Sequence, residues 1–595
     1  MAEKLADIPR NMRSHSSGVI LSVQPLDEIA PLQWSAAEGT EEDESIDPYW
    51  RIVQWDKRSA KYFFDKFDIL CLRGQDVLSG TESRMRVSFP NFDAKTISLQ
   101  DEESYRAMRS GELIGIPQSA SPAMRQAHVR LRTENLHDAS LVQAGIRPGV
   151  GGAVKMNTLI ARRRGLEPYS FEHPELENIL GHTYGIVVFQ EQIDQLLQSF
   201  CGYSSGEAED IRDKIHKRRR EDYGQLIRDE ILHRIQSRGF SESIASHVFE
   251  LIAAFKGYGF AQGHALAFAD ISIRSIHCQQ NYPAPYFASL LSAQPAGYYG
   301  PCTLANEARQ RGVLLLRPDV CKSEDDFSVE DVTTELMQTP LRVPSGAIRI
   351  ALKQIAGLSQ PTRSAILRER QGAPFASFFD FVSRVRPPRD ELTLLILSGA
   401  LDTFNPNRRC MLAAIPEALE FAQLLHQASL PLTFPEPKLP ELVDFSVADR
   451  ALHERRILGL DIESHLMSFE RECVSRKGAL STREAKNLRP GRKAIVVGNP
   501  IRLRFPPTPS GKRVVFFDLE DEAGLLNVTC FDRVYQLDGH AIVCSPYVTL
   551  IGHAQDRDGH TAFLAKRVFP YRPRLLDQVV DKTHLPVESA DFLAR

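Results

Sequence analysis

The sequence predicts a multidomain α+β protein with helices in its middle and a small β-barrel near its C-terminus. Helical spacing of apolar residues dominates positions 100 to 330 and returns between 346 and 415. Between about 490 and 570 the spacing changes to every second residue, which is typical of strands. A chain of 595 residues is long enough for about four domains.

The composition limits the classes of protein that the chain can belong to. Its formal net charge is -4, so any contact with nucleic acid must come from local patches. Nine cysteines without a CxxC pair fit neither a disulfide framework nor a zinc ribbon and are typical of a reducing cytosol. The first 20 residues lack a signal-peptide core, and no apolar run approaches the ~18 residues needed to span a bilayer. We therefore expect a cytoplasmic protein that does not bind membranes.

Residues 1–75 contain three short strand-like runs, GVILSV, RIVQWD and KFDILCL. The acidic segment EGTEEDESIDP interrupts them and has the charge of a solvated loop. The sequence predicts a small sheet here, too short to be a complete domain.

A basic helix is the strongest local signal in the helical region. It begins with GYSSGEAEDIRDKIHKRRR at Gly202, and the spacing of Ile211 and Ile215 predicts packing by one face. The cations then face either solvent or a polyanion. About 40 residues later comes GYGFAQGHALAFA (257–269), which resembles a phosphate-binding loop only loosely because it matches neither GxxxxGK[ST] nor a strand-anchored GxGxxG. Motifs of hydrolases and zinc enzymes, such as GxSxG and HExxH, are absent.

Two further features follow towards the C-terminus. The segment IAGLS around Gly357 predicts a hairpin between helices, either one whose backbone N–H groups hold a DNA phosphate or an ordinary connector. After a proline-rich stretch, the runs KAIVVG, RVVFFDLED, LLNVTCF, YVTLIG and FLAKRVF predict a compact five-stranded barrel. Phe516 and Phe517 alternate in the second run, so one of the two belongs to the barrel core.

Several segments, in order, resemble bacterial C-family DNA polymerases, the alpha subunits of DNA polymerase III, and most closely the error-prone branch. The similarity covers nearly the whole chain from about residue 8 and rests on IPRNMRSHSSGVILS (8–22), VQWDK and DKFDIL (53–70), IGIPQSASPAMRQ (114–126), IRPG (146–149), YGIVVFQEQ (184–192), GYSSGEAEDIR (202–212), GYGFAQGHALAFA (257–269), LLSAQPAGYYGP (290–301) and the terminal ESADFLAR.

The resemblance implies a domain order. It assigns the C-terminal part of the polymerase palm to 1–75, the fingers to 76–335, a helix-hairpin-helix DNA-binding module to 336–425, a linker to 426–489, an OB-fold to 490–572 and a tail to 573–595.

Family members copy DNA with two Mg²⁺ ions held by three palm aspartates. Asp68 matches the third aspartate, although an aspartate at a strand end is commonly a turn residue. The other two lie upstream in the family, so the chain resembles an N-terminally truncated polymerase that needs a separate palm-bearing chain for replication or damage bypass. The alternatives are a non-catalytic DNA- and clamp-binding protein and a relic of a decaying gene.

The resemblance also implies contacts with the deoxynucleoside triphosphate. The matching residues are Arg147, Arg212, Lys217, Arg218 and His264, with a capping role as the alternative for His264. The chain departs from the family pattern at Val150, Asp213 and Gln262, which puts retained triphosphate binding in doubt.

Two more sites are expected downstream. Gln427, Ser429, Leu430 and Leu432 resemble the peptide by which bacterial polymerases bind the sliding clamp. On the barrel, single-stranded DNA would meet cations and stacking aromatic residues. The candidates are Arg502, Arg504, Lys512, Arg513, Phe516 and Phe531.

Overall fold

The computed structural model describes residues 15, 18–34, 51–60, 62–146, 152–217, 221–253, 260–331, 346–427, 435–506, 508, 510–557 and 560–573. The chain divides into two compact units, Met1–Leu72 and Arg73–Arg595, and each is described by itself. None of the helices in the described ranges combines the length and the apolar composition that a membrane crossing requires.

The first unit contains two antiparallel pairs of strands. β1 (Gly18–Leu21) pairs with β4 (Asp65–Asp68), and β2 (Leu32–Trp34) pairs with β3 (Arg51–Val53). The helices α1 (Leu26–Ile29) and α2 (Lys57–Ala60) are single turns. Large apolar side chains remain exposed, because two-stranded ribbons bury little on their own; they are Tyr62, Phe63, Phe67, Ile69 and Leu70.

The second unit begins with a helical body around α13 (Gln262–Asn281), a 20-residue helix that packs on α6 (Leu136–Gly145) and α14 (Pro283–Ser292). Apolar residues from these helices share one core, including Ile273, Ile276 and Phe287. The surrounding helices are α3 (Arg73–Met85), α4 (Glu102–Ser110), α5 (Pro122–Leu131), α7 (Gly152–Arg163) and α15 (Pro301–Gln310).

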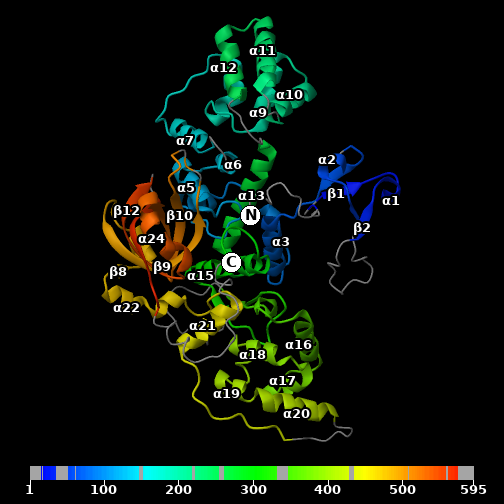
Figure 1. The fold of residues 1–595 in the computed structure, drawn as a ribbon, viewed down its shortest axis with the longest axis vertical. Helices are drawn as coiled ribbons and strands as arrows, with labels where there is room; N and C mark the ends of the chain where they lie inside the picture. The colour runs from blue at the N-terminus through cyan, green and yellow to red at the C-terminus, as the bar shows by residue number, and fades with distance from the viewer. Residues whose placement is uncertain are drawn as a thin grey trace, which may run out of the picture. The chain divides into compact units, whose positions relative to one another are not determined.

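Four helices form a group with a core of their own, visible as one cluster in Figure 1. They are α9 (Gln190–Cys201), α10 (Ser205–Lys217), α11 (Glu221–Ser237) and α12 (Glu242–Ala253), and the buried residues of α8 (Pro174–Leu180) belong to the same core. On α9 the apolar residues Ile193, Leu196, Leu197 and Phe200 recur at helical spacing and are fully buried in this core. The polar residues of α9 therefore lie on its other faces.

A three-stranded sheet and a second helical group follow. The sheet has the order β5 (Leu314–Leu316), β7 (Ala347–Arg349), β6 (Ser328–Glu330). The helical group comprises α16 (Gln360–Gly372), α17 (Phe378–Val385), α18 (Arg389–Leu397), α19 (Arg408–Ala413) and α20 (Ile415–Gln427). Gly357 precedes α16, and the element before it is the 3-10 turn Leu352–Gln354 rather than an α-helix.

The described part of the predicted linker contains regular elements. It contains α21 (Val447–Leu458), the 3-10 turn Leu466–Phe469, α22 (Arg471–Arg476), β8 (Ala479–Leu480) and α23 (Thr482–Lys486). Apolar residues of these elements, including Leu452, Met467 and Val474, form a small core with Val497 and Tyr547 of the barrel region.

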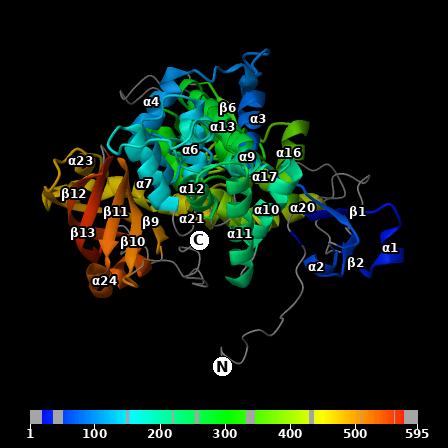
Figure 2. The ribbon, with the colours of Figure 1, turned by 90° about the horizontal axis from the view of Figure 1, so that it is seen from above.

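The C-terminal barrel contains the five predicted strands. They are β9 (Lys493–Arg504), β10 (Val514–Asp521), β11 (Gly524–Phe531), β12 (Val548–Arg557) and β13 (His560–Pro570). The order β9-β10-β11-β13-β12 closes on β9, with β11 and β13 parallel and α24 (Asp532–Cys544) inserted between β11 and β12. Figures 1 and 2 show the strands gathered with α24 against them. This is the OB-fold, as predicted.

The register decides which phenylalanine of β10 belongs to the core. Phe517 is 1% exposed inside the barrel, with Val515 and Leu519. Phe516, one residue away, lies on the outer face because successive side chains of a strand point to opposite sides.

Candidate nucleotide and nucleic-acid site

Two carboxylates on α9 connect the predicted nucleotide-binding residues. Glu191 and Asp194 are three residues apart, so they lie on one face of the helix on adjacent turns. Asp194 forms an ion pair with Arg212 of α10. Both carboxylate oxygens of Glu191 accept the backbone N–H of Gln262, at 2.9 and 3.0 Å, where α13 begins. Helix α9 thus brings Arg212 and the N-terminus of α13 together.

The Arg212 side chain is largely buried and is paired with two carboxylates. Its side chain is 11% exposed, and a second carboxylate, Glu209, lies 3.4 Å away. Burial raises the pKa of Asp194, although the Arg212 guanidinium favours the charged form of this carboxylate. A phosphate that binds Arg212 must therefore compete with Asp194 and Glu209.

His264 lies in the first turn of α13 with an exposed side chain. Its ring stands between two aromatic rings, with centroids 4.9 Å from Phe260 and 4.5 Å from Phe268. It does not cap the helix, because the N-cap residue is Ala261 and the carboxylate of Glu191 accepts the first N–H. Beside it, a Cβ on Gly263 would meet nothing within 4 Å, so the helix start is open.

The side chains of the other predicted nucleotide-binding residues lie outside the described part of the chain. Lys217 is the last residue of α10, but its side chain is not described. Arg147 and Arg218 lie outside the described residues, as does Gly257–Gly259 of the glycine-rich loop.

Asp68 ends β4, opposite Gly18 of β1, as predicted for a strand-end residue. Its side chain is 48% exposed, contacts the Lys66 ammonium, and lies 3.7 Å from His15 Nδ1. A two-ion site needs several carboxylates around the ions. Among the described residues, Asp68 belongs to no group of three potential metal ligands. These residues alone do not fit a Mg²⁺ pair.

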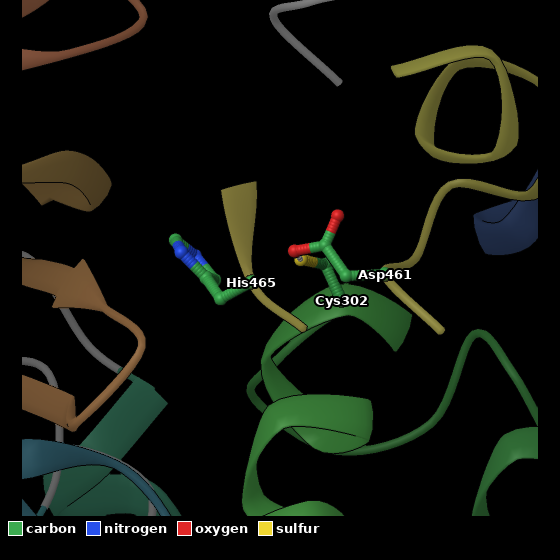
Figure 3. A group of neighbouring side chains, drawn as sticks. All are labelled: Cys302, Asp461 and His465. Atoms are coloured by element: carbon green, nitrogen blue, oxygen red, sulfur yellow. Dashed lines mark hydrogen bonds between the residues drawn. The ribbon is translucent and has the colours of Figure 1, made fainter. Parts of the chain in front are cut away.

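One group with metal-ligand chemistry does occur in the described ranges, made of Cys302, Asp461 and His465. Figure 3 shows the Cys302 sulfur beside the Asp461 carboxylate, 3.9 Å away, with the His465 ring to one side. Arg455 already binds Asp461 Oδ2 at 2.6 Å, and Arg309 donates to the Asp461 carbonyl.

Hydrogen bonding and burial set the protonation of this group. His465 Nδ1 accepts the Met467 N–H at 3.1 Å, so the proton of the neutral ring resides on Nε2 and blocks it as a ligand. Burial also raises the pKa of the Cys302 thiol well above its usual value. The group lies at a buried junction between α15 and the segment after α21, where Asp461 Oδ1 and His465 Nε2 have no hydrogen-bond partner among the described residues.

Gly357 takes a left-handed conformation, with φ +87°, that favours glycine. A Cβ at this position would lie 2.9 Å from Leu394 Cδ1. Much of the hairpin backbone is already engaged, because the N–H groups of Ala356 and Leu358 bond to carbonyls and that of Ser359 bonds to Glu391. Only part of this hairpin therefore remains for a DNA phosphate.

For the predicted clamp peptide, the structure describes only Gln427, the exposed last residue of α20. Ser429, Leu430 and Leu432 lie outside the described residues.

Lys512 and Arg513 line a shallow hollow of about 640 Å³ on the barrel. Residues 510–513 form one wall, and the other consists of Asp532, Tyr535, Gln536, Gly539 and His540 from α24. Phe531 is 49% exposed at the start of α24, and Phe505, 51% exposed, meets the Tyr535 ring at 5.6 Å. Cations and aromatic rings thus occur together here, as binding of single strands requires. Sequence reasoning missed Phe505 and Tyr535; the adjacency of Phe505 to Arg504 was the available signal.

The outer face of β10 is largely covered towards the C-terminal end of the strand. Asp518 and Glu520 are 0% and 1% exposed, and they bond to Tyr299 and Thr303 of the helical body. Burial raises the pKa of Glu520 to about 7. Residues of this barrel that are predicted to bind DNA can therefore be exposed only near the N-terminal end of β10 and on the neighbouring elements.

Two parts of the chain match models of known protein families. Residues 76–239 match the model of the bacterial DNA polymerase III alpha subunit finger domain, and residues 312–411 match that of a helix-hairpin-helix motif. The error-prone DNA polymerase of Symbiobacterium thermophilum is 35% identical over 97% of this chain. Over nearly its whole length the chain is similar to the bacterial DNA polymerase III alpha family. Its resemblance to that family, error-prone branch included, is thereby confirmed.

Other members of the DNA polymerase III alpha family are similar at lower identity. The error-prone DNA polymerase of Anaeromyxobacter dehalogenans is 29% identical over 93% of the chain, and the DNA polymerase III subunit alpha of Bacillus subtilis is 28% identical over 90%. The chain spans about half the length of these relatives, namely 54%, 48% and 46% of the three proteins.

Proposed function

We propose that this chain is the nucleotide- and DNA-handling part of a template-directed DNA polymerase of the error-prone type, acting in replication or damage bypass. The observation that carries the proposal is the convergence of Arg212 and the open start of α13 on one face of α9. A guanidinium and a helix N-terminus are both groups that bind phosphate oxygens. The incoming deoxynucleoside triphosphate would place its phosphates there, beside His264.

Glu191 and Asp194 hold this site in the absence of nucleotide. Each carboxylate occupies a position where a phosphate oxygen would bind, so the triphosphate exchanges with them rather than entering an unpaired cationic pocket. This exchange reduces the affinity but keeps Arg212 and α13 in place.

Metal chemistry requires further palm residues. Asp68 is the only predicted metal-binding aspartate in the chain, and a palm-bearing chain would supply the others together with Mg²⁺. The exposed Phe67, Ile69 and Leu70 around β4 support such a partner, because added strands would bury them. Primer-template DNA would contact the hairpin module and the barrel, and the sliding clamp would bind residues 427–432.

Primer extension tests the proposal. The purified chain alone should not extend a primer, whereas the chain with a palm-bearing polypeptide, Mg²⁺ and deoxynucleoside triphosphates should. Asp68→Ala should abolish this extension, with Asp65→Ala, an exposed residue of the same strand, as the control. Extension that survives Asp68→Ala would refute the metal role of Asp68.

A non-catalytic protein that binds DNA and the clamp is the second candidate. It is favoured by the carboxylate partners of Arg212 and by the pairing of Asp68 with Lys66. The two functions differ in nucleotide binding. A chain that binds single-stranded DNA but gives no measurable heat with deoxynucleoside triphosphates in calorimetry would be the non-catalytic protein.

A further inference from the structure

Three segments that are far apart in the chain meet at the first turn of α15. Cys302 and Thr303 are consecutive residues of this turn, and each contacts a carboxylate from another segment. The Cys302 sulfur lies 3.9 Å from Asp461 Oδ2, in the segment after α21 (Figure 3). The Thr303 hydroxyl donates to Glu520 Oε2 of β10 at 3.0 Å. The helical body thus contacts both the linker and the barrel through two carboxylates.

Both carboxylates are buried, and each has one oxygen atom without a partner. Asp461 and Glu520 are 3% and 1% exposed. Asp461 Oδ1 and Glu520 Oε1 have no hydrogen-bond partner among the described residues. Buried acceptors without a partner are rare in folded proteins and require an explanation. An ionised carboxylate only accepts hydrogen bonds, so two carboxylates bond to each other only when one of them carries a proton.

The surrounding cations are divided unequally between the two carboxylates. Arg455 of α21 binds Asp461 Oδ2 at 2.6 Å, and Arg309 of α15 donates to the Asp461 carbonyl. Burial opposes the charge of Asp461, but these guanidinium groups lower the pKa of its carboxyl below the ordinary value. Glu520 has a neutral partner, the Thr303 hydroxyl, and burial raises its pKa to about 7. Glu520 is therefore the carboxyl that carries a proton, and Asp461 is the charged acceptor beside it.

We propose that a proton held between Glu520 Oε1 and Asp461 Oδ1 fastens the barrel to the helical body, and that loss of this proton to solvent loosens the contact. With the proton present, Glu520 donates to the charged Asp461 carboxylate, and one hydrogen bond satisfies both unpartnered oxygens. Without the proton, two negative charges lie together at a buried interface, where neither is hydrated. Rising pH therefore shifts the contact from the fastened to the loosened state.

The other titratable groups that face these two carboxylates keep one charge state while Glu520 titrates. Arginine stays cationic. Burial raises the pKa of the Cys302 thiol and of the Tyr547 hydroxyl, so both keep their protons. Burial lowers the pKa of His465 to about 3, so its ring is neutral above that pH. By element, the facing groups are Cys302 and Arg309 of α15, Arg455 of α21, His465 after that helix and Tyr547 before β12. The proton of Glu520 therefore dominates the pH dependence of this contact.

Thiol labelling of the full chain over a series of pH values tests the proposal, with mass spectrometry to assign each modified cysteine. Cys302 reports on the contact, and the exposed Cys544 of α24 corrects for the pH dependence of thiol chemistry. The ratio of Cys302 to Cys544 labelling should rise up to about tenfold per pH unit between pH 4.5 and about 7, because the loosened state binds fewer protons there. Above this range the ratio should level off. Cys278, buried in α13, should stay unlabelled throughout.

Two variants identify the groups that hold the proton. Glu520→Gln keeps a hydrogen-bond donor at every pH, so its labelling ratio should stay low and constant. Asp461→Asn removes the neighbouring negative charge, so the rise in labelling should move to lower pH. Glu472→Gln, an exposed residue of α22, should behave like the unaltered chain.

A labelling ratio that does not change with pH in the unaltered chain would overturn the proposal, as would an equal rise in Glu520→Gln. An unchanged midpoint in Asp461→Asn would exclude Asp461 as the acceptor and overturn the shared proton. Labelling of Cys278 in step with Cys302 would mean that the whole chain unfolds, and would overturn the specific loosening of the barrel contact.

Discussion

Glu191 accepts the backbone N–H of Gln262 through both carboxylate oxygens, 71 residues away along the chain, at 2.9 and 3.0 Å. This contact attaches the start of α13 to α9, next to the Asp194–Arg212 pair. A carboxylate at a helix N-terminus accepts hydrogen bonds from N–H groups that would otherwise be unpaired. Its negative charge also interacts favourably with the positive end of the helix dipole.

Glu191→Ala should therefore lower the free energy of unfolding by about 1 to 2 kcal/mol, the usual cost of losing an N-terminal cap. Chemical denaturation followed by circular dichroism measures the change. Glu250→Ala, on the exposed face of α12, should stay within about 0.5 kcal/mol of the unaltered chain. Equal losses for the two variants would show that the Glu191 contact contributes nothing specific.

Asp194→Asn should strengthen nucleotide binding, because it removes the charge that competes with a triphosphate for Arg212. Arg212→Ala should weaken binding about tenfold or more, through loss of a charge-assisted hydrogen bond. Calorimetric titration with a deoxynucleoside triphosphate measures both, with Arg228→Ala on α11 as a control for the removal of a cation. Weaker binding by Asp194→Asn would contradict the competition between carboxylate and phosphate.

Gly357→Ala should destabilise the hairpin by about 1 to 3 kcal/mol, because φ +87° is unfavourable for alanine and the new Cβ would crowd Leu394. Gly372→Ala is the matched control, since a Cβ there meets nothing within 4 Å and the glycine has no positive φ. Thermal unfolding compares them. A smaller loss for Gly357→Ala than for Gly372→Ala would refute the conformational argument.

Stability should decrease as the pH rises through the range in which Glu520 titrates. Burial raises its pKa from 4.5 to about 7, so between these values the folded chain binds more protons than the unfolded chain. The free energy of unfolding then falls with increasing pH over this interval. Glu520→Gln removes the titrating proton, so its stability should fall less steeply. Parallel pH profiles of the variant and the unaltered chain, measured by denaturant midpoints, would contradict the assignment.

Phe531→Ala should weaken binding of single-stranded DNA by about 1 to 3 kcal/mol if a base stacks on its exposed ring. Leu537→Ala is the control, because Leu537 is also exposed on α24, at 68%, but offers no aromatic face. Anisotropy titrations distinguish the two. Equal weakening would indicate a general apolar contact instead of stacking.

Much of the fold was predictable because it depends on local patterns. Alternation of apolar residues located all five barrel strands, and spacing of three and four located the helices of the α9 group. Periodicity could not predict that the strand order closes through a parallel β11–β13 pair, since this depends on which strands meet in space. Nor could it show that the second half of the predicted linker packs against the barrel.

The sequence by itself determined the α+β class, the barrel strands, the identity of the cations and the family resemblance, because each is a property of neighbouring residues or of their order. Only the tertiary structure decided how those cations are paired. Arg212 meets Asp194 from 18 residues away, and Arg502 and Arg504 meet a tyrosine of the helical body. Such contacts depend on the packing of whole helices and strands. The neighbours of a cation in the sequence therefore do not show whether the fold pairs it with a carboxylate or leaves it available for phosphate.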